Sequence, residues 1–334
     1  MNLDLPDVYF TPEYIKNFEN IDNGIFVAYI YENKVGKIYY PFLKREIKTI
    51  LNNTQYYDII SPYGYNGPII LECNQNRKLQ LVAEFTIEFK LYCKNNNIVS
   101  SFMRFHPILE NHKDFLNKCT VNVIRKTVGI SLIGNIFDEY RPECKNKIKK
   151  AIKLGVKVEI DMDCSRIKDF FDIYTETMQN NEASDYYFFT YGFFENTVKN
   201  LGDKIMLVNA FIDDEIIGSA MFMIYGDNMH YHFSGTKRKY WGYASNNLIL
   251  HTAAEWGAAN NKKILHLGGG RTNSKDDNLF LFKKSFTQNT FFDFAVGRNI
   301  YNQVVYDALC KIALGKDPSI DTQYFPIYRG YKSI

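Results

Sequence analysis

The amino-acid sequence predicts an α/β protein built from two similar units. Its 334 residues can form two separate cores, because domains usually hold about 100–200 residues. A strand–turn–strand pattern with a glycine early in its second strand occurs around Gly36 and again around Gly218, as in an internal duplication. Stretches with helical spacing of apolar residues separate the strands, which indicates an α/β fold rather than a sandwich or a bundle.

In the first half, Thr11 and Pro12 are typical of a helix start, and Gly24 of its end. The following segments are rich in β-branched and aromatic residues around a polar turn, which predicts a hairpin. Helical spacing and β-branched runs then alternate along the chain. The predicted elements are strands at 25–31 and 35–42, a helix at 77–94, and strands at 98–105 and 122–132.

In the second half, a basic helical run ends at Gly155, as a C-terminal glycine would end it. We place the domain change nearby, which gives an N-terminal domain at 1–140 and a C-terminal domain at 141–334. The predicted helices are 143–154, 166–180, 193–201 and 245–260, and the predicted strands are 156–160, 206–212, 216–223, 229–234 and 264–267.

The composition limits the classes of function. Of the residues, 46% are hydrophobic and 23% are charged, and the net charge is only +3. We therefore expect no extended polycationic surface and no DNA partner, although a local basic patch could contact phosphate groups. Six scattered cysteines without a CxxC pair predict reduced thiols and no zinc site. No stretch of about 18 apolar residues occurs, and we expect a cytoplasmic protein without a transmembrane segment.

The strongest candidate site follows the strand at 229–234. Alternation places His230, His232 and Ser234 on one face of this strand, with Tyr231 and Phe233 on the other. Ligands of open α/β sheets bind beyond the strand ends and at helix N-termini. The residues expected there are Ser234, Gly235, Thr236, Asn246, Asn247, Gly268 and Gly269. The alternative is a flexible loop, since the glycines match neither a Walker A nor a dinucleotide motif. No third ligand completes a metal site with the two histidines.

A second candidate is Lys283, between Phe282 and Phe286. The two phenylalanines are four residues apart and would anchor one face of a helix. Lys283 would then be fixed beside this apolar anchor, whereas Lys284 would point elsewhere. The alternative is a pair of solvated lysines.

Four motifs together resemble the FemABX-like transferases. These motifs are Ser245-Asn246-Asn247-Leu248, Ala253-Ala254-Glu255-Trp256-Gly257, Leu265-His266-Leu267-Gly268-Gly269-Gly270 and Phe282-Lys283-Lys284-Ser285-Phe286. The resemblance covers about residues 185–295 and is weaker over the first half. It implies two tandem GNAT-like domains, each a mixed, mostly antiparallel sheet flanked by helices. It also implies that Lys283 lies in the active site, and that the chain is of the type without a long helical arm.

The same resemblance implies transfer of an amino acid from aminoacyl-tRNA to an amine of a peptidoglycan precursor. Such a reaction requires charge stabilisation on the carbonyl oxygen, which Lys283 and amides of 234–236 would supply. His232 is the first candidate for a general base, with Asp276 or Asp277 as alternatives.

In the first half, Arg104 and His106 end a strand, and Tyr63 and Tyr65 lie in a turn-rich segment. Arg104 could bind a phosphate or carboxylate of the acceptor, and the tyrosines could form an aromatic lip for a sugar or peptide. The alternative is a structural role for all four. The first half has no counterpart of Phe282-Lys283, so we expect it to serve the acceptor.

The acyl donor stays open at this stage. Residues 239–244, Lys-Tyr-Trp-Gly-Tyr-Ala, fit the spacing of the pyrophosphate loop of GNAT acetyltransferases. We expect no tightly bound cofactor, with aminoacyl-tRNA or acetyl-CoA as co-substrate. The alternatives to a FemABX-like transferase are a CoA-dependent N-acetyltransferase of an amino sugar or small amine, and a non-catalytic GNAT-like binding module. A monomer or a homodimer is expected.

Overall fold

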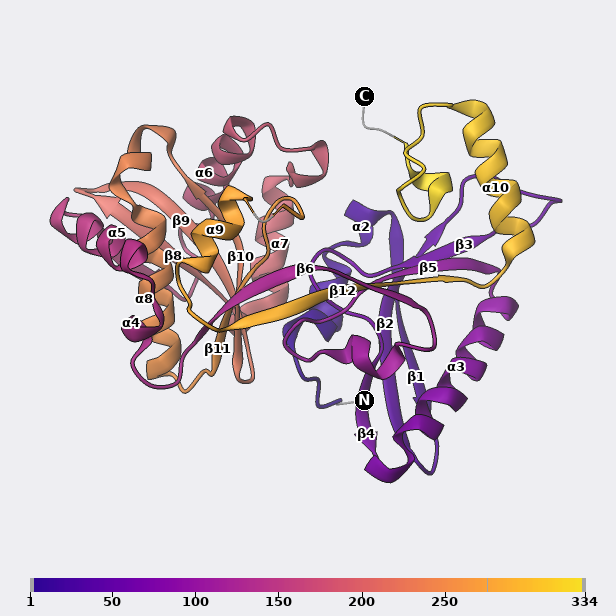
Figure 1. The fold of residues 1–334 in the computed structure, drawn as a ribbon. Helices are drawn as coiled ribbons and strands as arrows, with labels where there is room; N and C mark the ends of the chain where they lie inside the picture. Colours follow the sequence, from indigo (N-terminus) through magenta and orange to yellow (C-terminus); the bar gives the residue numbers. More distant parts are fainter. Residues whose placement is uncertain (1–2, 275, 332–334) are drawn as a thin grey trace. The chain divides into compact units, whose positions relative to one another are not determined.

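The computed structural model describes residues 3–274 and 276–331, which divide into two units (Figure 1). Unit 2 holds Pro6–Val8 and Arg125–Phe292, and unit 1 holds the rest. The chain enters unit 2 within β6 (Thr120–Ser131) and returns to unit 1 within β12 (Phe291–Ile300). This division differs from the single boundary predicted after residue 140, because the C-terminal segment packs on the N-terminal core.

Unit 1 is built on a mixed sheet with the strand order β1-β2-β3-β5-β12, and β4 also pairs with β2. Strands β3 and β5 run parallel, and the other pairs are antiparallel. The backbone of β4 approaches Gly36 of β2 so closely that a Cβ at this position would lie 2.1 Å from the Glu72 carbonyl oxygen. The strands are β1 (Gly24–Glu32), β2 (Gly36–Glu46), β3 (Tyr57–Ile60), β4 (Ile69–Cys73) and β5 (Ile98–Arg104).

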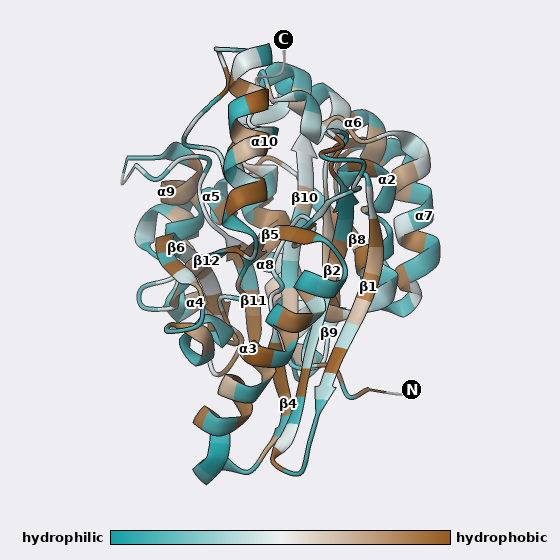
Figure 2. Cartoon of the chain, turned by 90° about the vertical axis from the view of Figure 1, so that its right-hand side faces the viewer, coloured by the Kyte–Doolittle hydropathy of each residue, from teal (hydrophilic) through white to brown (hydrophobic). Residues whose placement is uncertain are grey.

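The longer helices of unit 1 are α3 (Lys78–Asn95) and α10 (Gln303–Lys316). Each carries both apolar and polar residues (Figure 2), as expected of helices that are buried on one face only. The helix predicted from Pro12 is split into α1 (Pro12–Lys16) and α2 (Glu19–Asp22), with the Thr11 hydroxyl capping α1 as expected.

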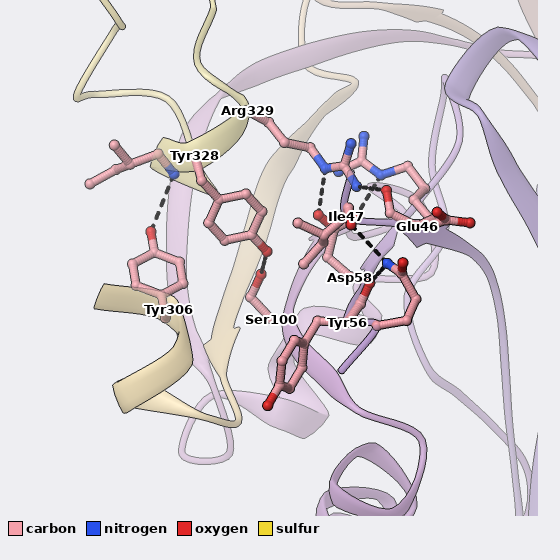
Figure 3. A network of polar contacts seen from close by, with 11 residues as sticks. Glu46, Ile47, Tyr56, Asp58, Ser100, Tyr306, Tyr328 and Arg329 are labelled. Atoms are coloured by element: carbon pink, nitrogen blue, oxygen red, sulfur yellow. Dashed lines mark hydrogen bonds and ion pairs between the residues drawn. The ribbon is translucent and has the colours of Figure 1, made fainter. Parts of the chain in front are cut away.

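A buried polar network joins the C-terminal segment to the strands of unit 1 (Figure 3). Asp58 accepts hydrogen bonds from Arg45 Nε (2.8 Å) and Arg329 Nε (2.5 Å). The Tyr328 and Ser100 hydroxyls are 2.8 Å apart. The carboxylate of Asp58 is fully buried, so two guanidinium groups compensate the cost of its desolvation.

Unit 2 contains a sheet with the strand order β6-β11-β10-β9-β8-β7. Strands β10 and β11 run parallel, and all other neighbours are antiparallel. The strands are β7 (Lys157–Asp161), β8 (Ile205–Ile212), β9 (Glu215–Tyr225), β10 (Asn228–Thr236) and β11 (Ile264–Gly268). The hairpin β8–β9 is the predicted repeat of β1–β2, and a bulge interrupts its pairing next to Gly218.

Helices cover both faces of the unit 2 sheet. One core contains residues of α5, α8 and the α9 segment, and on the other face Phe233 of β10 packs among aromatic rings of α6 and α7. The helices are α4 (Ile136–Glu139), α5 (Pro142–Lys153), α6 (Ile167–Asn180), α7 (Tyr191–Leu201), α8 (Ser245–Ala259) and α9 (Asn278–Lys284). The predicted α/β fold class is confirmed, and no described helix has the combination of length and apolarity that a membrane crossing requires.

We expect Asp58→Asn to lower the free energy of unfolding by about 3–5 kcal/mol, because it leaves the buried Arg45 cation without its anionic partner. Arg329→Gln should lower the free energy of unfolding by a smaller amount, since the Arg329 side chain is partly exposed. Urea unfolding of both variants measures the difference. Equal losses for the two substitutions would contradict this account of the network.

Candidate active site

Lys283 is almost fully buried near the end of α9, with 8% of its surface exposed. Phe286, also buried, lies in edge contact with Phe282, with ring centroids 5.5 Å apart, as the spacing of the two phenylalanines predicted. The Lys283 Nζ donates a hydrogen bond to the Gly269 carbonyl oxygen at 2.8 Å. It also lies 5.8 Å from the centroid of the Tyr231 ring. The solvated lysine pair is therefore not what the structure shows.

Lys283 reaches the place where two parallel strands stop pairing. Strands β10 and β11 pair only over Asn228–His230 and Ile264–His266. Beyond this point β10 stays paired with β9, and β11 stays paired with β6. Tyr231 is the first residue of β10 past the shared register, and Gly269 follows β11. The amine of Lys283 thus lies between Tyr231 of β10 and Gly269 after β11, at the point where the two strands part.

The glycine loop after β11 is held by Asp277 and Arg125. Asp277 accepts hydrogen bonds from the Arg271 and Thr272 amides (2.9 and 2.8 Å) and caps α9 at the Phe280 amide (2.8 Å). The Arg125 guanidinium donates to the Gly270 carbonyl at 2.8 Å. A Cβ at Gly270 would lie 2.5 Å from the Asp277 carboxylate. The loop therefore has defined hydrogen bonds and is not the open flexible linker of the alternative prediction.

The surroundings of Lys283 change its protonation. Burial lowers the pKa of Lys283 to about 7, because the charged ammonium loses hydration. The nearby Asp277 carboxylate opposes this shift in pKa, and the Arg125 guanidinium adds to it. Both the ammonium and the neutral amine are consequently populated near neutral pH. Perturbed groups of this kind are concentrated at functional sites.

His232 occupies a β-bulge that the predicted alternation did not include. Tyr231 pairs with Phe222 and Phe233 with Met221, so His232 is the extra residue on β10. The bulge reverses the faces: the Tyr231 hydroxyl donates to the Ser234 hydroxyl, so these two residues share a face instead of lying on opposite ones. This corrects the predicted grouping of Ser234 with the histidines. Burial and the neighbouring His230 lower the pKa of His232 to about 3.

The other predicted residues of unit 2 make packing and hydrogen-bond contacts. Gly235 lies against α6, where a Cβ would meet the Ile173 carbonyl at 2.6 Å. The Thr236 amide donates to the Thr177 hydroxyl (3.0 Å), and the Thr236 hydroxyl donates to the Asn246 side chain (2.9 Å). Asn247 is buried and contacts Cys144 Sγ at 3.8 Å. The Thr236 amide is thus engaged within the protein.

The basic loop that fits the GNAT spacing is paired with Glu215. Its Lys239 and the preceding Lys237 each form an ion pair with Glu215, at 3.0 and 2.9 Å. The Tyr240 hydroxyl donates to the same carboxylate at 2.6 Å. The hydrogen bonds from Tyr240, Lys237 and Lys239 lower the pKa of Glu215 to about 2. A hollow of about 340 Å³ beside Lys237 is lined by the Arg166 guanidinium and by several more carboxylates, those of Asp169, Asp172, Glu176 and Asp214.

The predicted residues of the first half lie in unit 1. The Tyr65 ring contacts the His106 ring edge-on at 5.8 Å, and His106 is fully buried. The Arg104 guanidinium donates to the carbonyls of Ser61 (3.0 Å) and Pro62 (3.3 Å). Tyr63 accepts a hydrogen bond at its backbone carbonyl from the Tyr14 hydroxyl (2.6 Å). These contacts order the turn at 61–65.

The sequence did not single out three contributors to the site of unit 2. Arg125 lies inside a predicted strand, and no pattern connected it with a glycine loop more than a hundred residues later. Strict alternation places the Tyr231 ring on the opposite face, and no local signal predicts the bulge that turns it. Asp7 is fully buried with its Oδ2 2.8 Å from His230 Nε2, a long-range contact without a local signal.

Comparisons with known proteins agree with this geometry. Residues 139–276 match the family model described as an acetyltransferase (GNAT) domain. No curated protein matches the sequence significantly. Among solved structures, FemX is similar with a TM-score of 0.68 and 12% identity, over 92% of this chain and 95% of that one. A conserved protein of unknown function from Bacteroides thetaiotaomicron has a TM-score of 0.57 and 10% identity, over 90% of this chain and 94% of that one. L-PGS from Bacillus licheniformis has a TM-score of 0.52 and 9% identity, over 88% of this chain and 93% of that one.

This chain has a FemX-like fold. The resemblance drawn from the four motifs is confirmed at the level of the fold, over nearly the whole length of both chains. The GNAT match lies entirely within unit 2, the unit that contains Lys283, and confirms the prediction of an acyltransferase. An acyl donor is therefore a co-substrate of this FemX-like protein.

We expect Lys283→Met to stabilise the protein most below pH 7. Below pH 7 the folded wild-type protein buries an ammonium group, which lowers its stability. As the pH rises, the stability of the wild-type protein increases, because Lys283 loses its proton near pH 7 in the folded state but keeps it to about pH 10.5 in the unfolded state. The advantage of the variant should shrink by roughly 2–3 kcal/mol between pH 6 and 9. Chemical denaturation across this range measures the difference, with Lys284→Met, at the partly exposed neighbouring lysine, as control. A pH-independent difference would contradict the buried, perturbed amine.

Proposed function

We propose that this protein transfers an aminoacyl group from an ester donor, aminoacyl-tRNA, to an amine of a cell-envelope precursor. The observation that carries the proposal is the buried amine of Lys283 at the point where β10 and β11 part, beside Tyr231 and Gly269. A lysine with a pKa near 7 can accept a proton and then hold a positive charge at the same atom. An amine attacking an ester carbonyl requires both capabilities.

The proposed reaction forms one bond and breaks another. The acceptor nitrogen attacks the ester carbonyl carbon, and neutral Lys283 takes the proton that the nitrogen loses. The resulting ammonium stabilises the negative charge that develops on the carbonyl oxygen. When the ester C–O bond breaks, the ammonium returns the proton to the leaving oxygen. The amide product and a free hydroxyl on the donor result.

The geometry supports Lys283 over two of the base candidates that the sequence suggested, His232 and Asp277. His232, with a pKa of about 3, is a much weaker base than an amine near 7. Burial alone would raise the pKa of Asp277, but hydrogen bonds from Phe280, Thr272 and Arg271 lower it overall. Asp277 therefore suits a fixed anion that orders the glycine loop. We assign it and Arg125 as positioning residues.

Glu215 supports an aminoacyl ester over acetyl-CoA as the donor. Lys239 of the GNAT-like loop and the preceding Lys237 are paired with Glu215, and further carboxylates line the hollow beside it. A pyrophosphate placed there would compete with Glu215 for both cations and meet several like charges. The acceptor class follows from the resemblance to FemABX-like transferases. Unit 1, which has no counterpart of Lys283, is proposed to bind the acceptor.

We expect Lys283→Ala to lower turnover by about 10²–10⁴-fold, the usual contribution of a general base. Lys283→Arg should be similarly inactive, because a guanidinium keeps the positive charge but stays protonated. Wild-type turnover should rise with pH through about 7, as the neutral amine becomes populated. Initial rates from pH 5.5 to 9 measure these effects, with Lys284→Ala as control. An active Lys283→Arg variant would reduce the role of Lys283 to electrostatics.

The donor and acceptor are tested together by intact-mass analysis. A UDP-linked muramyl peptide is incubated with the protein and either a mixture of aminoacylated tRNAs or acetyl-CoA. We expect the acceptor to gain one amino-acid residue, only with the tRNA mixture and only with wild-type protein. An acetylated amine would support the N-acetyltransferase alternative instead. Tight binding of the precursor without reaction from either donor would support the binding module.

A further inference from the structure

Helix α5 of unit 2 presents a concentrated positive surface. Its buried face contains Cys144, Ile148 and Ala151, which belong to the same hydrophobic core as the buried residues of α8. The opposite side is exposed and basic; its lysines are Lys147, Lys149, Lys150 and Lys153. The whole chain has a net charge of only +3. The positive charge is therefore concentrated locally on α5, and acidic residues elsewhere in the chain balance most of it.

These four lysines form no ion pair with any residue that the structure describes. Other lysines are neutralised, such as Lys168 by Asp172 (2.5 Å) and Lys263 by Asp227 (2.7 Å). The one acidic residue of α5 is Glu143, in its first turn, where it favours the positive end of the helix. The charge of the lysine face is thus available to an external anion.

Two aliphatic side chains lie exposed beside the lysines. Ile152, within the last turn of α5, is 58% exposed, and Leu154, directly after the helix, is 42% exposed. Exposed aliphatic groups gain free energy when an apolar medium covers them. Lysines with exposed aliphatic residues on one helix are typical of segments that lie on a membrane surface. Arginine and aromatic side chains, which stack on nucleic-acid bases, are absent from the exposed side of α5.

We propose that the lysine face of α5, with Ile152 and Leu154, docks the protein on a bilayer of anionic phospholipid. The ammonium groups would lie among the headgroup phosphates, and the two aliphatic side chains would enter the boundary with the acyl chains. Charge complementarity selects the anionic lipid, and the aliphatic pair selects a bilayer over RNA. The proposal uses no residue of the active site and does not depend on the proposed function.

The test is co-sedimentation of the full chain with vesicles. We expect binding to vesicles of phosphatidylcholine with phosphatidylglycerol, and little binding to phosphatidylcholine alone. Replacing the four lysines by glutamine should weaken binding by several hundred-fold (about 600-fold), since each cation near an anionic surface contributes about a factor of five. Ile152→Ser with Leu154→Ser should weaken it by roughly fivefold. The control replaces Lys34, Lys48, Lys311 and Lys316, exposed lysines of unit 1, by glutamine.

Three results would overturn the proposal. The first is equal binding by the α5 variant and the charge-matched control. The second is an unchanged affinity after loss of the two aliphatic side chains, which would leave a purely electrostatic surface. The third is a variant that loses binding to bulk tRNA while its vesicle binding is intact, which would assign the surface to RNA. Thermal denaturation confirms folding, because all substitutions leave the buried face of α5 unchanged.

Discussion

The burial of one amine is the constraint on which the candidate active site of this FemX-like protein depends. The Gly269 carbonyl accepts a hydrogen bond from Lys283 and so compensates part of the hydration that the buried amine loses. That carbonyl is available because the glycine loop turns after β11 under the control of Asp277 and Arg125. The loop tolerates no side chain at Gly270, whose Cβ would enter the Asp277 carboxylate. The glycine loop, the cap of α9 and Lys283 therefore depend on one another for their positions.

The sheet of unit 2 provides the place for this amine. Strands β10 and β11 pair over three residues and then part, each kept in the sheet by its other neighbour. The bulge at His232 turns the β10 side chains so that Tyr231 and Ser234 share one face, while Phe233 joins the aromatic core of α6 and α7. Because of the bulge, β10 contributes Phe233 to core packing and Tyr231 to the candidate site.

Much of unit 2 could be predicted because its signals are local. The periodic apolar residues of α5, α6 and α8 and the cap and glycine signals gave elements close to those observed, and Phe282 and Phe286 located Lys283 on an apolar helix face. The bulge at His232 could not be predicted, since alternation is the default for a short apolar strand. Contacts such as Arg125 with Gly270, and Asp58 with Arg329, join residues far apart in sequence and have no local signal. The same holds for the return of the C-terminal segment to unit 1.

The most direct measurement is the pKa of the Lys283 amine in the folded protein. Competitive acetylation with acetic anhydride in folded protein, quantified by peptide mass spectrometry from pH 5 to 11, gives the midpoint for each lysine separately. Our account requires a midpoint near 7 for Lys283, with Lys284 as the neighbouring reference on the same helix. A Lys283 midpoint near 10.5, the ordinary value, would show a solvated cation and would contradict both the buried site and its proposed role as a base.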